Sequence, residues 1–178
     1  MKSGHRLLAL AEELERQLAT KKDLLVPTSL MRHHTDEAGT THLTIEEPQA
    51  PQQYGVTDLA RRQLADKLRI PFAYFERMRT QHPALLDNNV NTWLQGEDEH
   101  RLVRTLDGKV RAVLSDRYRR LDNYDLAEHV LPILQWLPGM ELVSHELTET
   151  RMYLKAVTSK LEFEVVPGDI VQAGVAIS

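Results

Sequence analysis

The chain has 178 residues, of which 42% are hydrophobic, 27% charged and 6% aromatic, with eight glycines, eight prolines and no cysteine. This composition is typical of a folded globular chain and excludes collagen-like, disordered and disulfide-rich proteins. The lack of cysteine excludes thiol catalysis and thiolate metal sites, and it suits a reducing compartment. No apolar run approaches the ~20 residues of a membrane span, so we expect a cytoplasmic protein without membrane contact.

The charge is distributed unevenly along the chain. The formal net charge is −4, but residues 101–120 contain seven basic and only two acidic residues. This segment therefore carries +5 and leaves −9 on the other 158 residues. A basic segment within an acidic protein indicates one local anion-binding surface and excludes a polycation that binds nucleic acid everywhere.

Residues 1–96 are expected to form a mostly helical N-terminal region. Leucine and alanine at helical spacing predict an amphipathic helix over residues 4–20. Three further helices are indicated by an N-cap and by prolines that fit first helical turns, at Thr57, Pro71 and Pro83. Two short strands and an extended linker complete the region, at residues 23–27, 41–47 and 47–55 respectively.

Residues 97–178 are expected to form an α+β sheet domain. The dipeptide Asp107-Gly108 separates two β-rich runs, and it is the strongest short signal for a hairpin. A helix is expected from Asn123 as its N-cap, and three strands follow at residues 140–149, 151–166 and 169–178. The predicted fold class is therefore α+β, with a mostly helical N-terminal half followed by a β-β-α-β-β-β antiparallel or mixed sheet unit.

A two-residue turn at Asp107-Gly108 pairs Arg104 with Arg111 on the solvent face, beside Lys109. Like charges that face each other across strands destabilise a sheet unless an anion lies between them. The anion is either a carboxylate, from Glu97, Asp98, Glu99, Glu146 or Glu149, or the phosphate of a nucleic acid. In the second interpretation Tyr118 is a stacking ring. The candidate nucleic-acid-binding residues are then Arg104, Lys109, Arg111, Arg117, Tyr118, Arg119 and Arg120.

The residue patterns give little support to catalysis or to a bound metal. GxSxG, GxxxxGK[ST] and GxGxxG are all missing, so a nucleophile elbow, a Walker site and a Rossmann site are not indicated. Asp116 and Asp122 are more simply explained as ion-pair partners of neighbouring arginines than as paired catalytic carboxylates. We interpret as solvated loop residues, rather than metal ligands, the side chains of His33, His34, Asp36 and His42. No catalytic residue, metal or cofactor is assigned.

The stretch GKVRAVLSDRYRRLDNYDLAEHVLPIL, residues 108–134, carries a family resemblance. It resembles the prokaryotic phage/plasmid-like family known as domain of unknown function nine hundred and thirty-two, whose hallmark is a strand of the type "vvSdrY.vvdN" followed by a helix and strands. The hallmark corresponds here to residues 113–118 and 121–123, and the similarity covers residues 55–178. The resemblance implies a home on mobile elements and supplies neither an activity nor a catalytic residue. A likeness in outline to single-strand annealing proteins is fold-level analogy.

We therefore predict a nucleic-acid-binding accessory protein of a phage or plasmid, acting on single- or double-stranded nucleic acid in recombination or replication. The alternative is a protein-interaction module of a mobile element that modulates a host factor and makes no nucleic-acid contact. A third hypothesis is a hydrolase completed by residues beyond Ser178, because the last apolar run predicts a longer parent sequence. Homo-oligomerisation is left open by each of these hypotheses.

Overall fold

The computed structural model describes residues 2–96, 98–148 and 151–178. The chain divides into two compact units. The continuous unit comprises residues 20–119, whereas the discontinuous unit combines residues 1–19 with residues 120–178. The boundary expected after residue 96 therefore lies inside the continuous unit. Among the described residues, no helix is long and apolar enough to cross a membrane.

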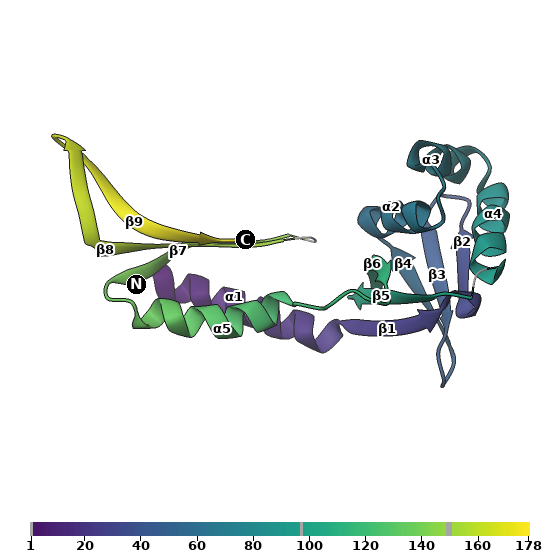
Figure 1. The fold of residues 1–178 in the computed structure, drawn as a ribbon, viewed down its shortest axis with the longest axis horizontal. Coiled ribbons are helices and arrows are strands. Elements are labelled where there is room, and N and C mark those ends of the chain that lie inside the picture. The colour runs from purple at the N-terminus through teal and green to yellow at the C-terminus, as the bar shows by residue number, and fades with distance from the viewer. Residues whose placement is uncertain (1, 97, 149–150) are drawn as a thin grey trace. The chain divides into compact units, whose positions relative to one another are not determined.

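The continuous unit is built on a six-stranded sheet with the order β1-β5-β6-β4-β3-β2 (Figure 1). Neighbouring strands are antiparallel, except that β4 and β6 run parallel. A short 3-10 helix, Thr28–Leu30, joins the first two strands. The strands are β1 (Lys22–Pro27), β2 (Met31–Thr35), β3 (Thr41–Glu46), β4 (Pro51–Val56), β5 (His100–Leu106) and β6 (Lys109–Ser115).

Three helices contribute to the core of the continuous unit. They are α2 (Asp58–Lys67), α3 (Phe72–Gln81) and α4 (Pro83–Gly96). Thr57 caps α2 as predicted, because its side chain accepts a hydrogen bond from the Ala60 N–H. The buried side chains of all three helices form one apolar cluster with those of the sheet, including Phe75, Leu43 and Val103. The fully buried part of this core is drawn from residues 26–113, and Leu24 packs against it.

The β5–β6 hairpin confirms the predicted turn but not its predicted register. Asp107 and Gly108 both have positive φ, 51° and 72°, as a type I′ turn requires. Lys109 pairs with Leu106, and Val110 with Thr105, but a bulge follows and Arg104 lies opposite Ala112. The expected pairing of Arg104 with Arg111 is therefore wrong, because Arg111 is the additional residue of the bulge.

The discontinuous unit packs two helices against a three-stranded sheet of order β7-β8-β9. Its core combines Leu10 and Leu14 of the first helix with Ala127 of the second and with Met152 and Leu154 of the sheet. Segments from opposite ends of the chain thus share one core. The elements are α1 (Lys2–Thr20, the last residue of which lies in the continuous unit), α5 (Asn123–Trp136), β7 (Met140–Leu147), β8 (Met152–Val166) and β9 (Asp169–Ile177).

The predicted arrangement of a mostly helical N-terminal half followed by a β-β-α-β-β-β unit is wrong. Four strands precede α2, and the predicted hairpin completes their sheet instead of starting a new one. Residues 31–35, read as loop, form β2 because Met31, His33 and Thr35 alternate inward, although two of these three side chains are polar. The predicted linker overlaps β4, a strand whose Tyr54 and Val56 are buried.

Candidate nucleic-acid interface

Arg104 is the one predicted contact residue that the sheet buries. It lies on β5 directly opposite Asp23 of β1, and both side chains are less than one-tenth exposed. Its Nε donates to Asp23 Oδ1 at 2.8 Å and its Nη2 to Asp23 Oδ2 at 3.3 Å, which is a bidentate pair. A carboxylate therefore balances this arginine. The partner lies 81 residues earlier in the chain, on β1, and it is not among the carboxylates that the sequence analysis considered.

The carboxylate that pairs with Arg104, Asp23, is not one of those expected to balance the hairpin. Glu97 and Glu149 lie outside the described residues. Glu99 pairs with Arg101, at the start of β5, and so balances a different arginine. The carboxylate interpretation is thus supported at Arg104, through a residue of the neighbouring strand β1.

Lys109 and Arg111 differ in their surroundings although both lie on β6. Lys109 is exposed beside the turn, where it pairs with Leu106 on one side and with Gly55 on the other. Arg111 is half-buried, and its Nε is among the buried side-chain atoms of the sheet. Of these two cations, only Lys109 extends into solvent.

A second group of cations follows the end of β6. Asp116 and the four residues from Arg117 to Arg120 are all exposed, with Tyr118 at 46% of its full area. The segment leaves the strand in a turn in which the Tyr118 N–H donates to the Ser115 carbonyl oxygen at 3.1 Å. We call residues 117–120 the basic segment.

The N-terminus of α5 anchors the chain directly after the basic segment. Asp122, and not the expected Asn123, is the N-cap residue, and it forms a capping box with Asp125. The Asp122 N–H donates to Asp125 Oδ2 at 3.3 Å. The hallmark motif of residues 113–123 therefore comprises the end of strand β6, the basic segment and the N-terminus of helix α5.

The electrostatic setting of the basic segment differs from that of other arginines in the protein. Arg61 and Arg79 both pair with Glu76, at 3.1 Å and 2.8 Å respectively. Arg117 and Arg119 have no ion-pair partner among the described residues, and the same is true of Lys109. β6 separates Lys109 from the basic segment, and its seven residues span roughly 20 Å at about 3.3 Å each. Lys109 on one side and Arg117 with Arg119 on the other therefore form two groups and not one continuous track.

A buried histidine cluster, which the sequence analysis interpreted as a solvated loop, joins β2 to α4. His33 is buried, and its Nδ1 lies 2.8 Å from Asp87 Oδ1. Asp87 Oδ2 accepts the Thr35 N–H at 2.9 Å, and His34 Nδ1 lies 3.3 Å from the same oxygen. Burial alone raises the pKa of Asp87, but the bonds from His33 and Thr35 outweigh it and hold the pKa below its ordinary value.

The histidine cluster has the contacts of a structural feature. Asn91 accepts the His33 N–H at 2.8 Å and donates to the His33 carbonyl oxygen at 2.9 Å, while the His33 ring packs edge-on against Phe75. Within the described parts of the chain, no group of three or more His, Cys, Asp or Glu side chains is placed to hold a metal ion. Sequence spacing gave no signal for this cluster, because its members are 54 residues apart.

Tyr54, on strand β4, also has an altered pKa. Burial and the hydrogen bond that Tyr54 donates to Glu47 Oε1, at 2.5 Å, raise the pKa of the phenol. Lys22 lies 3.4 Å from the same phenol oxygen. A raised pKa keeps Tyr54 protonated at neutral pH, so this group is a hydrogen-bond donor and not a nucleophile.

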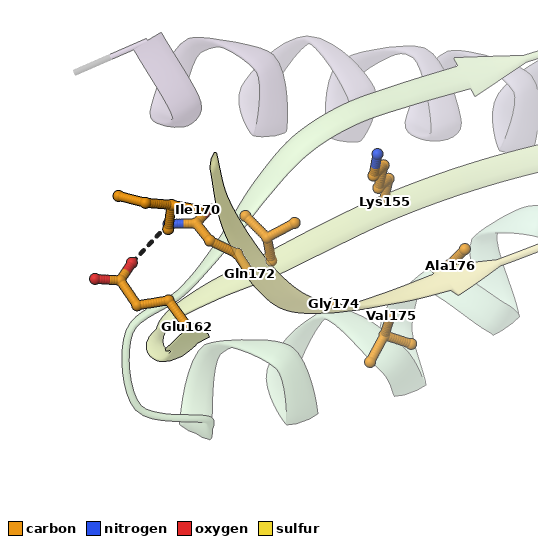
Figure 2. A pocket seen from close by; sticks show the side chains of 8 residues that line it. Lys155, Glu162, Ile170, Gln172, Gly174, Val175 and Ala176 are labelled. Carbon is orange, nitrogen blue, oxygen red and sulfur yellow. Dashed lines mark hydrogen bonds between the residues drawn. The ribbon is translucent and has the colours of Figure 1, made fainter. Parts of the chain in front are cut away.

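The discontinuous unit contains a hollow of about 620 Å³ along β8 and β9 (Figure 2). Its polar side chains are Lys155, Glu162 and Gln172, and Gln172 Nε2 donates to Glu162 Oε2 at 3.3 Å. The remaining lining is backbone and small apolar side chains. This hollow has no pairing of a nucleophile with a base and therefore indicates no reaction.

No protein-family model, curated protein or solved structure matches the chain. The resemblance to the phage/plasmid-like family therefore stays a prediction based on the residues of the hallmark motif.

Proposed function

We propose that the protein binds nucleic acid through the basic segment, residues 117–120. The observation that carries the proposal is the exposure of this run, in which Arg117 and Arg119 have no ion-pair partner among the described residues. In a chain of net charge −4, exposed cations without carboxylate partners create a local positive potential that attracts an anionic ligand. Tyr118 lies between them with nearly half of its surface exposed, which suits stacking on an unpaired base.

The burial of Arg104 reduces the number of phosphates that the site contacts. With Arg104 held by Asp23 and Arg111 half-buried, Arg117 and Arg119 of the basic segment remain as phosphate contacts. Each neutralised phosphate contributes about 0.7 to the salt slope on single strands, so the expected slope is about −1.4. Affinity should then fall about 7-fold between ~50 and ~200 mM salt. The six phosphate contacts expected from the sequence would give a far steeper response.

Fluorescence anisotropy with labelled single-stranded DNA, duplex DNA and RNA tests the proposal. The variant Arg117→Glu/Arg119→Glu should lose binding at ~50 mM salt, because it places carboxylates where phosphates are expected. The matched control Arg32→Glu/Arg77→Glu makes the same change of charge at two exposed arginines on β2 and α3, and it should bind like the wild type. Circular dichroism checks that both variants fold.

Equal losses in both variants would contradict a site at residues 117–120 and would indicate a general charge effect. Absence of binding by the wild type at ~50 mM salt would contradict nucleic-acid binding altogether. The assignment to recombination or replication on a mobile element is supported by the motif resemblance alone. It is tested by annealing of complementary strands, which a simple binding protein does not accelerate.

A protein-interaction module is the second candidate, and one observation favours it. The part of β8 and β9 beyond residue 160, which we call the arm, exposes Leu161, Phe163 and Val165, each more than half accessible. Phe163 lies directly opposite Val171 in the β8–β9 ladder, so these two apolar side chains share one face, whereas Leu161 and Val165 lie at irregularities of the register. An apolar face on a two-stranded ribbon is typical of a surface that a protein covers.

A further inference from the structure

The edge strands of the two sheets differ in whether neighbouring side chains cover their outer backbone groups. In the continuous unit, three side chains of α4, spaced four residues apart, form hydrogen bonds with backbone groups in and next to the edge strand β2. Asp87 accepts the Thr35 N–H, Asn91 bonds both the N–H and the carbonyl oxygen of His33, and Gln95 donates to the carbonyl oxygens of Ser29 and Met31. This edge therefore offers no free backbone groups at these residues to another strand.

Strand β9 is an edge without such protection. It pairs with β8 on one side, and no described strand pairs with its other side. Its sequence, DIVQAGVAI, contains one charged residue, Asp169 at its start, and neither lysine nor proline. The edge strand β1 ends in Pro27, and β7 carries Glu141 and Glu146, so each of these edges has a residue that opposes pairing.

We propose that β9 pairs edge to edge with β9 of a second copy of this chain, antiparallel about a two-fold axis at Ala173. This register pairs all nine residues of the strand, and it places Asp169 opposite Ile177 of the partner copy, so that no like charges face each other. Val171 faces Val175 across the axis in both directions. The interface is self-complementary, as a two-fold dimer requires.

The proposed pairing also extends the apolar face of the arm. Phe163 lies opposite Val171 in the β8–β9 ladder. In the joined sheet, Val175 of the second copy lies on the far side of Val171, so an apolar row crosses three strands. Val171 and Val175 are 40% and 43% exposed, and β9 of the second copy would cover part of this exposed surface. Figure 2 shows that Val175 points away from Lys155, so this row lies on the opposite side of the sheet from that charge.

The chain has no cysteine, so an introduced cysteine reports on its own position alone. Residues directly opposite in an antiparallel pair have Cα atoms about 4.5 to 5.5 Å apart, which lies within the range of a disulfide. The full-length Ala173→Cys variant should therefore form a covalent dimer on mild oxidation. Val166→Cys, at the exposed end of β8, is the matched control and should stay uncrosslinked under the same conditions.

Light scattering of the full chain provides the second readout. The wild type should be a dimer, and Ala173→Lys a monomer, because two lysines would face each other on the axis. Mixing Ala173→Lys with Ala173→Glu should restore a dimer that contains one copy of each. Hydrogen exchange should show that β9 amides become more protected as the concentration of the wild type rises, and this measurement needs no substitution.

Three results would overturn the proposal. The first is a wild type that stays monomeric and whose β9 exchange does not depend on concentration. The second is equal crosslinking of Ala173→Cys and Val166→Cys, which indicates random collision. The third is a dimer that Leu161→Lys dissociates and Ala173→Lys does not, since the contact would then involve the face of the arm and not the edge of β9. None of these outcomes depends on nucleic-acid binding.

Discussion

At the scale of single residues, Asp87 links pH to the stability of the continuous unit. Hydrogen bonds from His33 and Thr35 lower its pKa below the ordinary value of 3.8, against the opposing effect of burial. A carboxyl group with a lower pKa in the folded state contributes stability above its unfolded pKa and loses it as the pH falls through the folded pKa. We therefore expect the unfolding free energy to decline as the pH drops below about 4.

Replacement of Asp87 by asparagine tests this linkage. Asp87→Asn should lower the unfolding free energy at pH 7 by about 2 kcal/mol, because charge-assisted hydrogen bonds are lost, and it should flatten the decline below pH 4. Urea unfolding at pH values from 2 to about 7 measures both effects. The control Asp66→Asn changes an exposed carboxyl group of α2 and should leave the profile close to that of the wild type. Parallel profiles for wild type and Asp87→Asn would refute the assignment.

The residue scale also shows where sequence reasoning about the candidate site reaches its limit. The exposed run from Arg117 to Arg120 was identified from charge density alone, since consecutive residues need no knowledge of the fold. The environment of Arg104 was not, because its partner Asp23 is 81 residues away and is brought opposite it by the pairing of β1 with β5. Local sequence carries no information on such a pairing.

At the scale of elements, hydrophobic periodicity located all five helices and the three C-terminal strands. It missed β2 and β4, because the inward positions of β2 include His33 and Thr35 and because β4 begins with exposed proline and glutamine. The Asp107-Gly108 turn was predictable, since its positive φ angles need those residue types. The bulge beyond it was not, since no residue type in the strand demands one.

Strand β9 depends on a glycine at one position. A Cβ atom on Gly174 would lie 2.7 Å from the Ala156 carbonyl oxygen, which is backbone of β8 and cannot move aside. Gly174→Ala should therefore cost about 1 to 3 kcal/mol of unfolding free energy through overpacking. Gly96→Ala is the control, because a Cβ there meets nothing within 4 Å. Thermal unfolding compares the two, and equal midpoints would show that β8 and β9 approach less closely than described.

At the scale of the whole molecule, the two units differ in which parts of the sequence supply their cores. The core of the continuous unit is drawn from one uninterrupted stretch of sequence. The core of the discontinuous unit needs Leu10 and Leu14 from the N-terminal helix to cover Met152 and Leu154 of the sheet. Without that helix, Met152 and Leu154 would lose part of their cover, and α5 alone would have to bury them.

Removal of residues 1–19 should therefore unfold one unit and spare the other. We expect amides of β7, β8 and β9 to exchange at nearly the unprotected rate, because opening of this unit would cost little free energy without α1. Amides of β3, β5 and β6 should keep their protection, since Leu43, Val103 and Val110 pack in a core to which residues 1–19 contribute no side chain. Hydrogen exchange with mass spectrometry resolves both sets in one experiment. Retained protection in β8 would mean that α5 covers Met152 and Leu154 by itself, and loss of protection in both units would mean that the chain folds as one cooperative body.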